Sequence, residues 1–324
     1  MIIYTLVQEG EVKHEKVAKV KETEPILHIK GNKKRITSQS VFMISAIFWN
    51  IRGVRSKKAI HSLKRLTDIN NTHFVAIFEP FISKEKIDGY MRFLGFQHCH
   101  SNGNGKIWYF WNSFNNKKFF SESDQHITIK LDKAIINQYI LITTVYAKCN
   151  SIERRDLWSS FQQDSTMLND LWCIGGDFNV ILDPNEKLGG KPHRMYKSID
   201  FQNCMDICGI TDIGYSGTKL TWCNNRRPKK RIWKRLDRVF VNDLWDNLFQ
   251  RCSIRHMART RSDHRPFLIM NLSTNHNCTR YFRFLNYWIN LPGFYTIVED
   301  SWNSNVKGNH MWILQTKLKA LSKD

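Results

Sequence analysis

An apolar run meets two glycines and a polar pair in the stretch Leu171-Trp172-Cys173-Ile174-Gly175-Gly176-Asp177-Phe178-Asn179. The four apolar residues predict a buried strand, and the glycines let the backbone turn sharply or approach a ligand closely. Because side chains alternate between faces in an extended segment, we expect Asp177 and Asn179 to point the same way and Phe178 to point into a core. The stretch therefore predicts a carboxylate and a carboxamide side by side at the end of a buried strand.

A second motif, Ser262-Asp263-His264, follows a basic stretch far downstream. Histidine is the side chain whose unperturbed pKa lies nearest neutrality, and a neighbouring carboxylate can bind a metal or orient an imidazole. Carboxylates, an amide and a histidine occur here without a Ser or Cys nucleophile motif. This set indicates hydrolysis by an activated water, and the substrate that suits it is a phosphoester.

Composition narrows the class of protein. The 324 residues include 49 Lys and Arg against 29 Asp and Glu, a formal net charge of +20, and 42% are hydrophobic. The hydrophobic content supports a substantial core, and the charge favours a polyanionic partner, with nucleic acid the first candidate. Charge alone is weak support, since basic proteins without a nucleic-acid role are common.

Cysteine usage and hydropathy exclude several other classes. The eight cysteines contain no Cys-x-x-Cys pair, so neither structural zinc nor a disulfide framework is expected. The start of the chain meets Glu9 and Glu11 too early for a secretory signal, and no run approaches the roughly 20 apolar residues that span a bilayer. We expect an intracellular protein without a membrane partner.

Strand and helix patterns interleave after a polar beginning. Buried strands are predicted over residues 43–49, 74–78, 107–111, 126–131, 139–146 and 267–270, and short strands near Leu220 and Val239. Helices are predicted from the cap Ser56 to Asp68, from Asn150 with its capping-box partner Glu153 to Leu168, and over residues 196–208. The pattern predicts an α/β or α+β sandwich, with two sheets covered by helices.

Four of the predicted strands deliver a polar group where they end. These groups are Asn50, Glu79, Tyr146 and the Asp177 motif. In α/β sheets, strand ends are where sites form, because the loops there are free of ladder hydrogen bonds while the strands fix their roots. We expect these groups to converge.

In order along the chain, these motifs resemble the endonuclease/exonuclease/phosphatase superfamily of DNase I-like and abasic-site nucleases. The resemblance is greatest to the endonuclease domain of plant LINE-type non-LTR retrotransposons. It covers about Met43 to Leu272 and lies in Trp49-Asn50-Ile51-Arg52-Gly53, Glu79, Val145-Tyr146, Gly176-Asp177-Phe178-Asn179, Leu220-Thr221-Trp222, Leu236-Asp237-Arg238 and Ser262-Asp263-His264. It implies a four-layer sandwich of two mixed β-sheets flanked by helices. Many relatives have Gln-Glu-Thr where this chain has Phe78-Glu79-Pro80.

The chain divides into three segments, because the resemblance is flanked by a polar beginning without clear periodicity and by a helical pattern after Trp302. Residues 1–42 would be a flexible leader, residues 43–274 the catalytic domain, and residues 275–324 a helical tail. The sequence contains no adjacent Asp-Asp pair. The chain therefore resembles an endonuclease unit truncated before any reverse transcriptase.

The resemblance also implies a divalent cation, Mg²⁺ or alternatively Mn²⁺. Glu79 would be its principal ligand with Asn50 beside it, and Asp263 would lie at the metal or the leaving group. Hard oxygen ligands and a substrate phosphate are what Mg²⁺ selects. Read alone, Glu79 before Pro80 could also be a surface carboxylate that ends a strand.

Catalytic roles are carried over in the same way. Asp177 would orient and deprotonate the attacking water, and Asn179 would hold that geometry and donate to the phosphate. His264, positioned by Asp237, would contact the scissile phosphate. Tyr146 would hydrogen-bond to the same phosphate, and Thr221 would support the phosphate end. The plainer alternatives are an edge-strand aromatic for Tyr146 and a surface ion pair for Asp237-Arg238.

A basic run precedes Asp237, with an aromatic residue among its cations: Arg226-Arg227-Pro228-Lys229-Lys230-Arg231-Ile232-Trp233-Lys234-Arg235. It could be a solvated hairpin or a nuclear-localisation-like patch. The resemblance places a DNA-contacting hairpin here, so we expect these side chains to grip phosphates beside the scissile bond: Arg226, Arg227, Lys229, Lys230 and Arg231.

The function expected from the sequence is a Mg²⁺-dependent phosphodiesterase, a DNA endonuclease that nicks double-stranded DNA and leaves 3′-hydroxyl and 5′-phosphate ends. A nuclear location fits that substrate. Two alternatives stay open: a phosphatase or RNA exonuclease of the same fold, and a remnant that binds nucleic acid without cutting it. No protein partner is predicted.

Overall fold

The computed structural model describes residues 42–112, 117–133, 138–166, 169–249, 251–273 and 292–321. The leader expected over residues 1–42 lies outside this range except for its last residue. The two helices of the expected tail, α6 (Phe294–Asn303) and α7 (His310–Leu321), pack on each other through the Ser301 hydroxyl, which donates to the Lys317 carbonyl at 3.5 Å.

Two six-stranded mixed sheets form the body of residues 42–273. The first has the order β14-β15-β1-β2-β4-β3, with bounds Arg251–His256, Phe267–Ser273, Phe42–Asn50, Phe74–Phe78, Ile107–Trp111 and His98–Ser101. The second has the order β10-β13-β8-β7-β6-β5, with bounds Ile210–Asp212, Asp237–Asn242, Leu171–Asp177, Gln138–Tyr146, His126–Lys133 and Lys117–Glu122. Each sheet has one parallel pair at its centre, β1 with β2 and β7 with β8.

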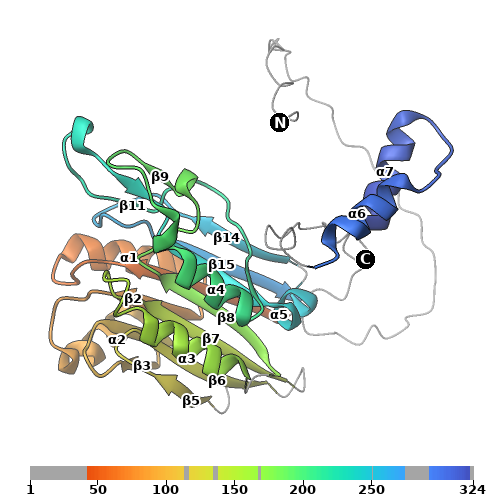
Figure 1. Ribbon diagram of the computed structural model, residues 1–324. Coiled ribbons are helices and arrows are strands. Elements are labelled where there is room, and N and C mark those ends of the chain that lie inside the picture. Colours follow the sequence, from red (N-terminus) through yellow and green to blue (C-terminus); the bar gives the residue numbers. More distant parts are fainter. Residues whose placement is uncertain are drawn as a thin grey trace, which may run out of the picture. The chain divides into compact units, whose positions relative to one another are not determined.

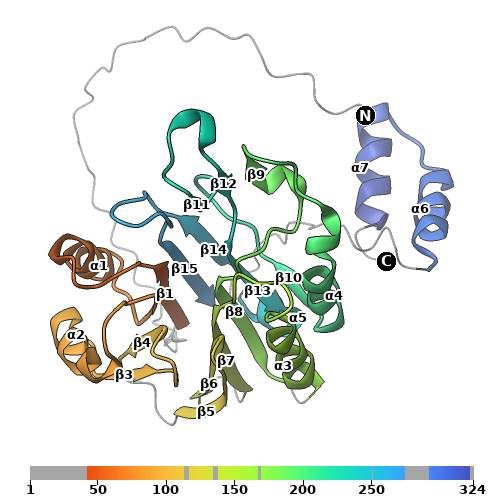
Figure 2. The same ribbon diagram turned by 60° about the vertical axis from the view of Figure 1, so that its left-hand side comes forward.

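Helices α1 to α4 cover the outer faces of these sheets (Figures 1 and 2), and α5 lies at one end, where its Trp245 enters the core between the sheets. Their bounds are Lys57–Ile69 for α1, Ile87–Leu94 for α2, Arg155–Thr166 for α3, Ile199–Ile207 for α4 and Asp243–Leu248 for α5. Short 3₁₀ helices occupy Lys84–Lys86, Pro184–Glu186, Met195–Lys197 and Pro228–Lys230. None of the helices in the described ranges is long and apolar enough to cross a membrane.

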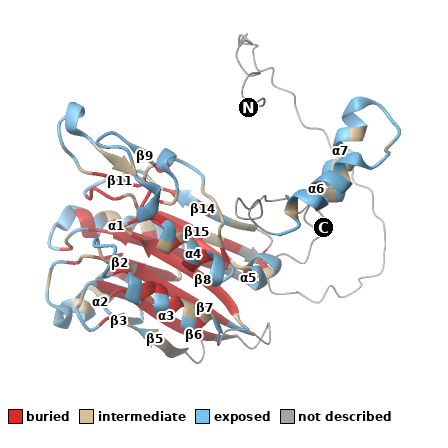
Figure 3. Cartoon of the chain, viewed as in Figure 1, coloured by how far each residue is buried: buried red, intermediate tan, exposed pale blue. Residues whose placement is uncertain are grey.

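The buried residues lie mainly in the strands of the two large sheets (Figure 3), and the apolar ones form three clusters. One buried cluster joins the inner faces of the two sheets, with Phe48 and Phe74 from the first against Ile142 and Val239 from the second. A second cluster lies between the first sheet and α1 and α2, and a third between the second sheet and α3 and α4. The layers are therefore helices, sheet, sheet and helices, which confirms the predicted four-layer sandwich.

The strands of the two large sheets that the sequence analysis missed are β3, β5, β10 and β14, which are their four edge strands. An edge strand pairs on one side only and is commonly short or polar, so it lacks the apolar run that marks a central strand. The His98-Cys99-His100 sequence of β3 is such a case. Apolar periodicity therefore identified the centres of the sheets and not their borders.

Two helix starts differ from the expectation. The Asn150 side chain accepts from the Ile152 amide within a turn, and α3 begins only at Arg155. Ser56 does occupy the position before α1, but its side chain makes no capping hydrogen bond.

A third sheet, small and antiparallel, has the order β11-β12-β9, with bounds Trp222–Cys223, Trp233–Lys234 and Lys187–Leu188.

Candidate active site

Strand register aligns the predicted polar groups at one edge of the sandwich. In the second sheet Asp177 lies opposite Tyr146 on parallel β7 and opposite Asp237 on antiparallel β13. In the first sheet, Asn50 at the end of β1 lies opposite Phe78, which precedes Glu79. The two sheets meet where the Asn50 amide nitrogen donates to Asp177 Oδ2 at 3.1 Å. The predicted convergence of strand ends is therefore present.

The backbone at the end of β8 is shaped by one glycine and one left-handed residue. A Cβ on Gly176, whose φ is +151°, would lie 2.0 Å from the Val145 carbonyl oxygen, so no side chain fits. Phe178 is fully buried as predicted. Asn179 has a φ of +51° and its amide nitrogen donates to Asp177 Oδ1 at 3.0 Å. A tight turn, and not strand alternation, therefore brings Asn179 beside Asp177.

Asn179 is also held by its side chain, which donates to the Ala147 carbonyl at 2.8 Å. The Asp177 carboxylate thus accepts from Asn50 on one oxygen and from the Asn179 backbone on the other. A fully buried carboxylate with both oxygens hydrogen-bonded has a defined orientation.

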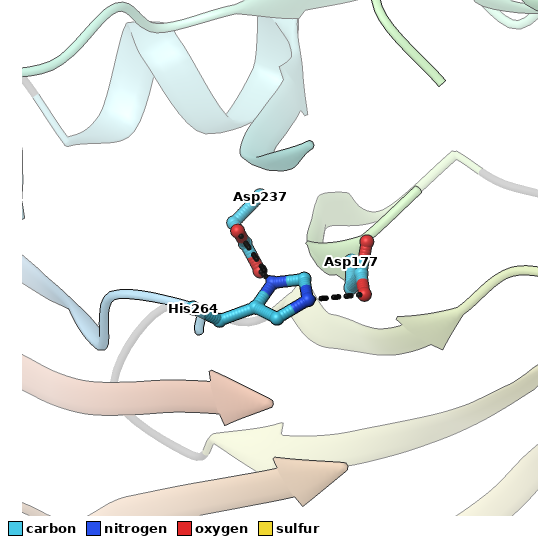
Figure 4. A group of neighbouring side chains, drawn as sticks. All are labelled: Asp177, Asp237 and His264. Carbon is cyan, nitrogen blue, oxygen red and sulfur yellow. Dashed lines mark hydrogen bonds and ion pairs between the residues drawn. The ribbon is translucent and has the colours of Figure 1, made fainter. Parts of the chain in front are cut away.

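His264 lies between two buried carboxylates (Figure 4). Its Nδ1 is 3.1 and 3.2 Å from the Asp237 oxygens, and its Nε2 is 3.7 Å from Asp177 Oδ2. Burial would lower the pKa of His264, but the charges of Asp237 and Asp177 offset it and raise that pKa to about 9. Burial raises the pKa of Asp177, and the nearby His264 opposes the increase.

Asp237 is itself positioned by a buried threonine. The Thr221 hydroxyl accepts from the amide nitrogens of Leu236 and Asp237 at 3.0 and 3.1 Å. Thr221 is fully buried, and its predicted support of the phosphate end stays a prediction. Its hydroxyl fixes the backbone that carries Asp237.

Glu79 belongs to a second group of contacts at the same edge. The Tyr146 hydroxyl donates to Glu79 Oε1, and Arg52 Nε lies 3.1 Å from Glu79 Oε2. Burial, and next the hydrogen bond to Glu79, raise the pKa of Tyr146 well above its ordinary value. Arg52 Nη1 also donates to Asp263 Oδ2 at 2.7 Å. Arg52 therefore links two of the three predicted metal ligands.

Asp263 is anchored from a second side as well. Its Oδ2 accepts from the Trp222 indole nitrogen at 2.9 Å, while the Ser262 hydroxyl of the same motif donates to the Asn50 carbonyl at 2.6 Å. The motif is thereby attached to both the first sheet and the small third sheet. No role for Arg52 or Trp222 was predicted, although both stand inside motifs that the sequence analysis quoted.

The donor set near Glu79 fits a hard divalent cation. Asn50 Oδ1 and Glu79 Oε2 are both buried and accept no hydrogen bond from the described residues, although Arg52 is ion-paired with the latter. Buried oxygens without a donor are costly unless something else compensates them, and a cation does so. They are also the two ligands that the resemblance implied.

A second oxygen and nitrogen group is less suited to a metal. Ligand atoms of Asp177, Asp237 and His264 all lie within 4.8 Å of one another. Both ring nitrogens of His264 already face a carboxylate, Nδ1 that of Asp237 and Nε2 that of Asp177, and these charges raise the pKa of the ring and favour its protonated form. This trio is better suited to proton transfer and to binding an anion.

The basic run lies in the small third sheet and divides into two parts. Antiparallel β11 and β12 form a hairpin whose tip carries the five predicted DNA-binding side chains, all exposed: Arg226, Arg227, Lys229, Lys230 and Arg231. Arg235, the last residue of the run, is buried and ion-paired with Glu186 and Asp212. It therefore belongs to the interior and not to a solvated surface.

The alternative of a surface ion pair at Asp237-Arg238 is also wrong. Both residues are fully buried, and Arg238 pairs with Glu186 and Asp212 on the side away from the site. This buried network of two arginines and two acids was not predicted, because its members are separated by up to 52 residues. It anchors the start of β13, and so supports the position of Asp237.

Known structures provide the comparison with this geometry. Neither a protein-family model nor a curated protein matches the sequence. The endonuclease domain of TRAS1, a telomere-specific non-LTR retrotransposon, is similar with a TM-score of 0.54 and 14% identity, over 72% of this chain and 100% of that one. The AP endonuclease LMAP of Leishmania major has a TM-score of 0.55 and 16% identity, over 71% and 87%.

A third similar structure is the 3′-5′ exonuclease NExo of Neisseria meningitidis, with a TM-score of 0.55 and 15% identity, over 70% of this chain and 98% of that one. With sequence identities of 14 to 16%, the similarity to these three structures shows a shared fold. Two six-stranded mixed sheets between helical layers, matched to these neighbours along most of their length, show that the chain has the DNase I-like α/β sandwich fold.

Proposed function

We propose that this protein is a divalent-metal-dependent phosphodiesterase that nicks double-stranded DNA and leaves 3′-hydroxyl and 5′-phosphate ends. One observation carries the proposal: the hydrogen-bonded array of Asp177, His264 and Asp237 lies beside two buried oxygens, Asn50 Oδ1 and Glu79 Oε2, that accept no hydrogen bond from the described residues. The array can handle a proton and an anion, and the oxygens can hold Mg²⁺, with Mn²⁺ as an alternative. A metal-dependent nuclease uses both the proton-transferring array and the cation.

Asp177 is the proposed base. Asn50 and the Asn179 amide fix its two oxygens, so the carboxylate is oriented to accept a proton from a water in line with the phosphorus. His264, protonated and fixed by Asp237, would donate from Nε2 to a non-bridging phosphate oxygen. It would thereby stabilise the negative charge that grows as the water attacks.

Glu79 and Asn50 would hold the cation, with Asp263 and Tyr146 supporting Glu79 through Arg52 and a direct hydrogen bond. A bound divalent ion would supply charge neutralisation at the phosphate and the leaving oxygen. Arg52 places one positive charge at the same position. We infer that it offsets the carboxylates there and contributes to phosphate binding.

The choice of DNA rests on charge and on one neighbour. The exposed cations at the hairpin tip, together with the net charge of +20, favour a long polyanion over a small phosphoester. The neighbour TRAS1 is a telomere-specific non-LTR retrotransposon, and the similarity to its endonuclease domain fits the proposed LINE-type origin. The proposed nuclear location rests on the choice of double-stranded DNA as the substrate. The closer tie to plant elements rests on the motifs alone.

Plasmid nicking tests the proposal. The purified chain should convert supercoiled plasmid to the open circular form with Mg²⁺ or Mn²⁺ and not with EDTA, and DNA ligase should reseal the nick. Asp177→Asn and His264→Ala should each lose at least about 100-fold in rate. Asp164→Asn is the matched control, since Asp164 is a buried carboxylate on α3 that accepts from Ser121.

Three results would reject the proposal. Equal nicking by the wild type and both active-site variants would indicate a contaminating nuclease. Failure to nick, combined with release of phosphate from mononucleotides or inositol phosphates, would favour the phosphatase alternative. Binding of DNA without any cleavage would identify a non-catalytic remnant.

A further inference from the structure

A pocket of about 540 Å³ opens beside the candidate active site and has no part in the mechanism above. Asn179 lies in its wall, and the same residue donates to Asp177. The other walls come from β9, the loop that follows it, the 3₁₀ helix Met195–Lys197, β12 and the segment before α3. These elements deliver six basic side chains: Arg154, Lys187, Lys191, Arg194, Lys197 and Lys234.

The lining of the pocket contains no carboxylate. The nearest acid in sequence, Glu186, is directed away, because it is paired with Arg235 and Arg238. Six cations thus surround one cavity without a protein counter-charge in its lining. Such a cluster destabilises the free protein by self-repulsion, and an anion in the cavity would relieve that repulsion.

Two of the lysines are forced together by the sheet. Lys187 on β9 and Lys234 on β12 are direct partners in the antiparallel register, and both are half-buried. Like charges directly opposite each other on neighbouring strands are destabilising. Burial, and next the charge of Lys187, lower the pKa of Lys234, which is a consequence of the same crowding.

Arg154 holds the side of the pocket nearest the active site. It is buried, and its Nη1 lies 2.8 Å from each of the carbonyl oxygens of Lys148 and Cys149 and 3.4 Å from that of Asn179. These partners are uncharged, so they fix the guanidinium without neutralising it. Arg154 therefore presents a fixed positive charge where the pocket adjoins Asn179.

We propose that this pocket binds a phosphate group of the nucleic-acid strand whose neighbouring phosphate lies at Asp177 and His264. The proposal rests on the proposed function, since it extends the same substrate past Asn179. A cavity of this size can admit a nucleotide-sized group. It is separate from the hairpin tip, whose residues do not line it, and so adds a second set of phosphate contacts.

Binding of a fluorescein-labelled DNA duplex, measured by anisotropy in EDTA over a range of salt concentrations, tests this proposal. The pocket variant carries Lys187→Gln, Lys191→Gln and Lys197→Gln. The control variant removes the same charge through Lys64→Gln, Arg65→Gln and Lys130→Gln. Lys64 and Arg65 are on the last turns of α1, and Lys130 pairs with Asp170 beside the start of β8.

Loss of one phosphate contact should reduce the slope of log Kd against log salt by about 0.9, and this is the change expected for the pocket variant. The control variant should keep the wild-type slope. Thermal melts should show that both variants are folded, and the single variant Lys191→Gln, at an exposed position, replaces the triple variant if that does not fold.

An equal slope for the pocket variant and the wild type would overturn the proposal. A second measurement would then identify the ligand. If the DNA slopes are equal but inorganic pyrophosphate raises the melting temperature of the wild type and not of the pocket variant, the pocket binds a free phosphate compound and not DNA. Binding is measured in EDTA and nicking with a metal, so the two tests are independent. If the wild type does not nick DNA, the proposed function fails, but the salt slopes still show whether the pocket binds a phosphate.

Discussion

The charge of Asp237 should control both the protonation of His264 and part of the stability of the fold. Asp237→Asn keeps the size of the side chain and removes the carboxylate that lies 3.1 Å from His264 Nδ1. The backbone should stay in place, since the Thr221 hydroxyl holds the Asp237 amide nitrogen and not its side chain. The substitution therefore tests electrostatics with little change in shape.

The magnitude follows from the pKa of His264. In the folded protein this pKa is raised from 6.5 to about 9, although burial alone would lower it. Such an increase corresponds to about 3 kcal/mol of preference for the protonated form. Asp237 is the largest favourable charge in that balance, so the variant should lose most of it.

A raised histidine pKa stabilises the fold at pH values below the unfolded pKa, and this contribution is lost as pH rises through the folded pKa. The wild type, free of metal in EDTA, should therefore lose up to about 3 kcal/mol in the free energy of urea unfolding between pH 6.5 and pH 9. Asp237→Asn should be less stable at pH 6.5 and nearly flat across that window. Titration of the His264 ring proton by NMR gives the pKa directly.

Asp164→Asn is again the control, and it should leave the His264 titration unchanged. The activity profile adds a third measure, because the alkaline limb of the nicking rate should move to lower pH in Asp237→Asn. A His264 pKa that stays near 9 in Asp237→Asn would refute the reasoning, since the ion pair would then have no effect on the imidazole.

Three further changes test other parts of the site. Thr221→Val leaves the Leu236 and Asp237 amides without an acceptor and should cost about 2 to 4 kcal/mol in urea unfolding, whereas Thr221→Ser should restore most of it. Arg52→Met removes the cation beside Glu79 and should tighten Mn²⁺ binding, measured by calorimetry; unchanged affinity would contradict the inferred offset. Alanine replacements at the hairpin tip should reduce the dependence of DNA binding on salt, and an unchanged slope would exclude a contact between the tip and DNA. The replaced residues are Arg226, Arg227, Lys229, Lys230 and Arg231.

Much of the site could be predicted because strand ends are visible in the sequence. Apolar runs predicted the central strands, and each of four runs ended in a polar residue at what became a shared edge. Parallel pairing at the centre of both sheets then brought Asn50, Glu79, Tyr146 and Asp177 together, as expected. Periodicity and chain order were sufficient for this part.

The partners of individual charged side chains could not be predicted in this way. Arg238 follows Asp237 in sequence, yet it pairs with Glu186 and Asp212, because successive residues of a strand face opposite sides. Thr221 was expected to support the phosphate end, but its partners, the amide nitrogens of Leu236 and Asp237, were not predicted. Ion pairs and hydrogen bonds of this kind depend on distances between segments that no local pattern records.

By itself, the sequence determined the class of fold, the central strands and the residue types at the catalytic edge, since hydrophobic burial acts through local periodicity. Only the tertiary structure decided that Arg52 joins Glu79 to Asp263 and that Lys187 faces Lys234 across two short strands. Coulomb energies depend on distance in space, and the fold brings together charges that lie up to 211 residues apart in sequence.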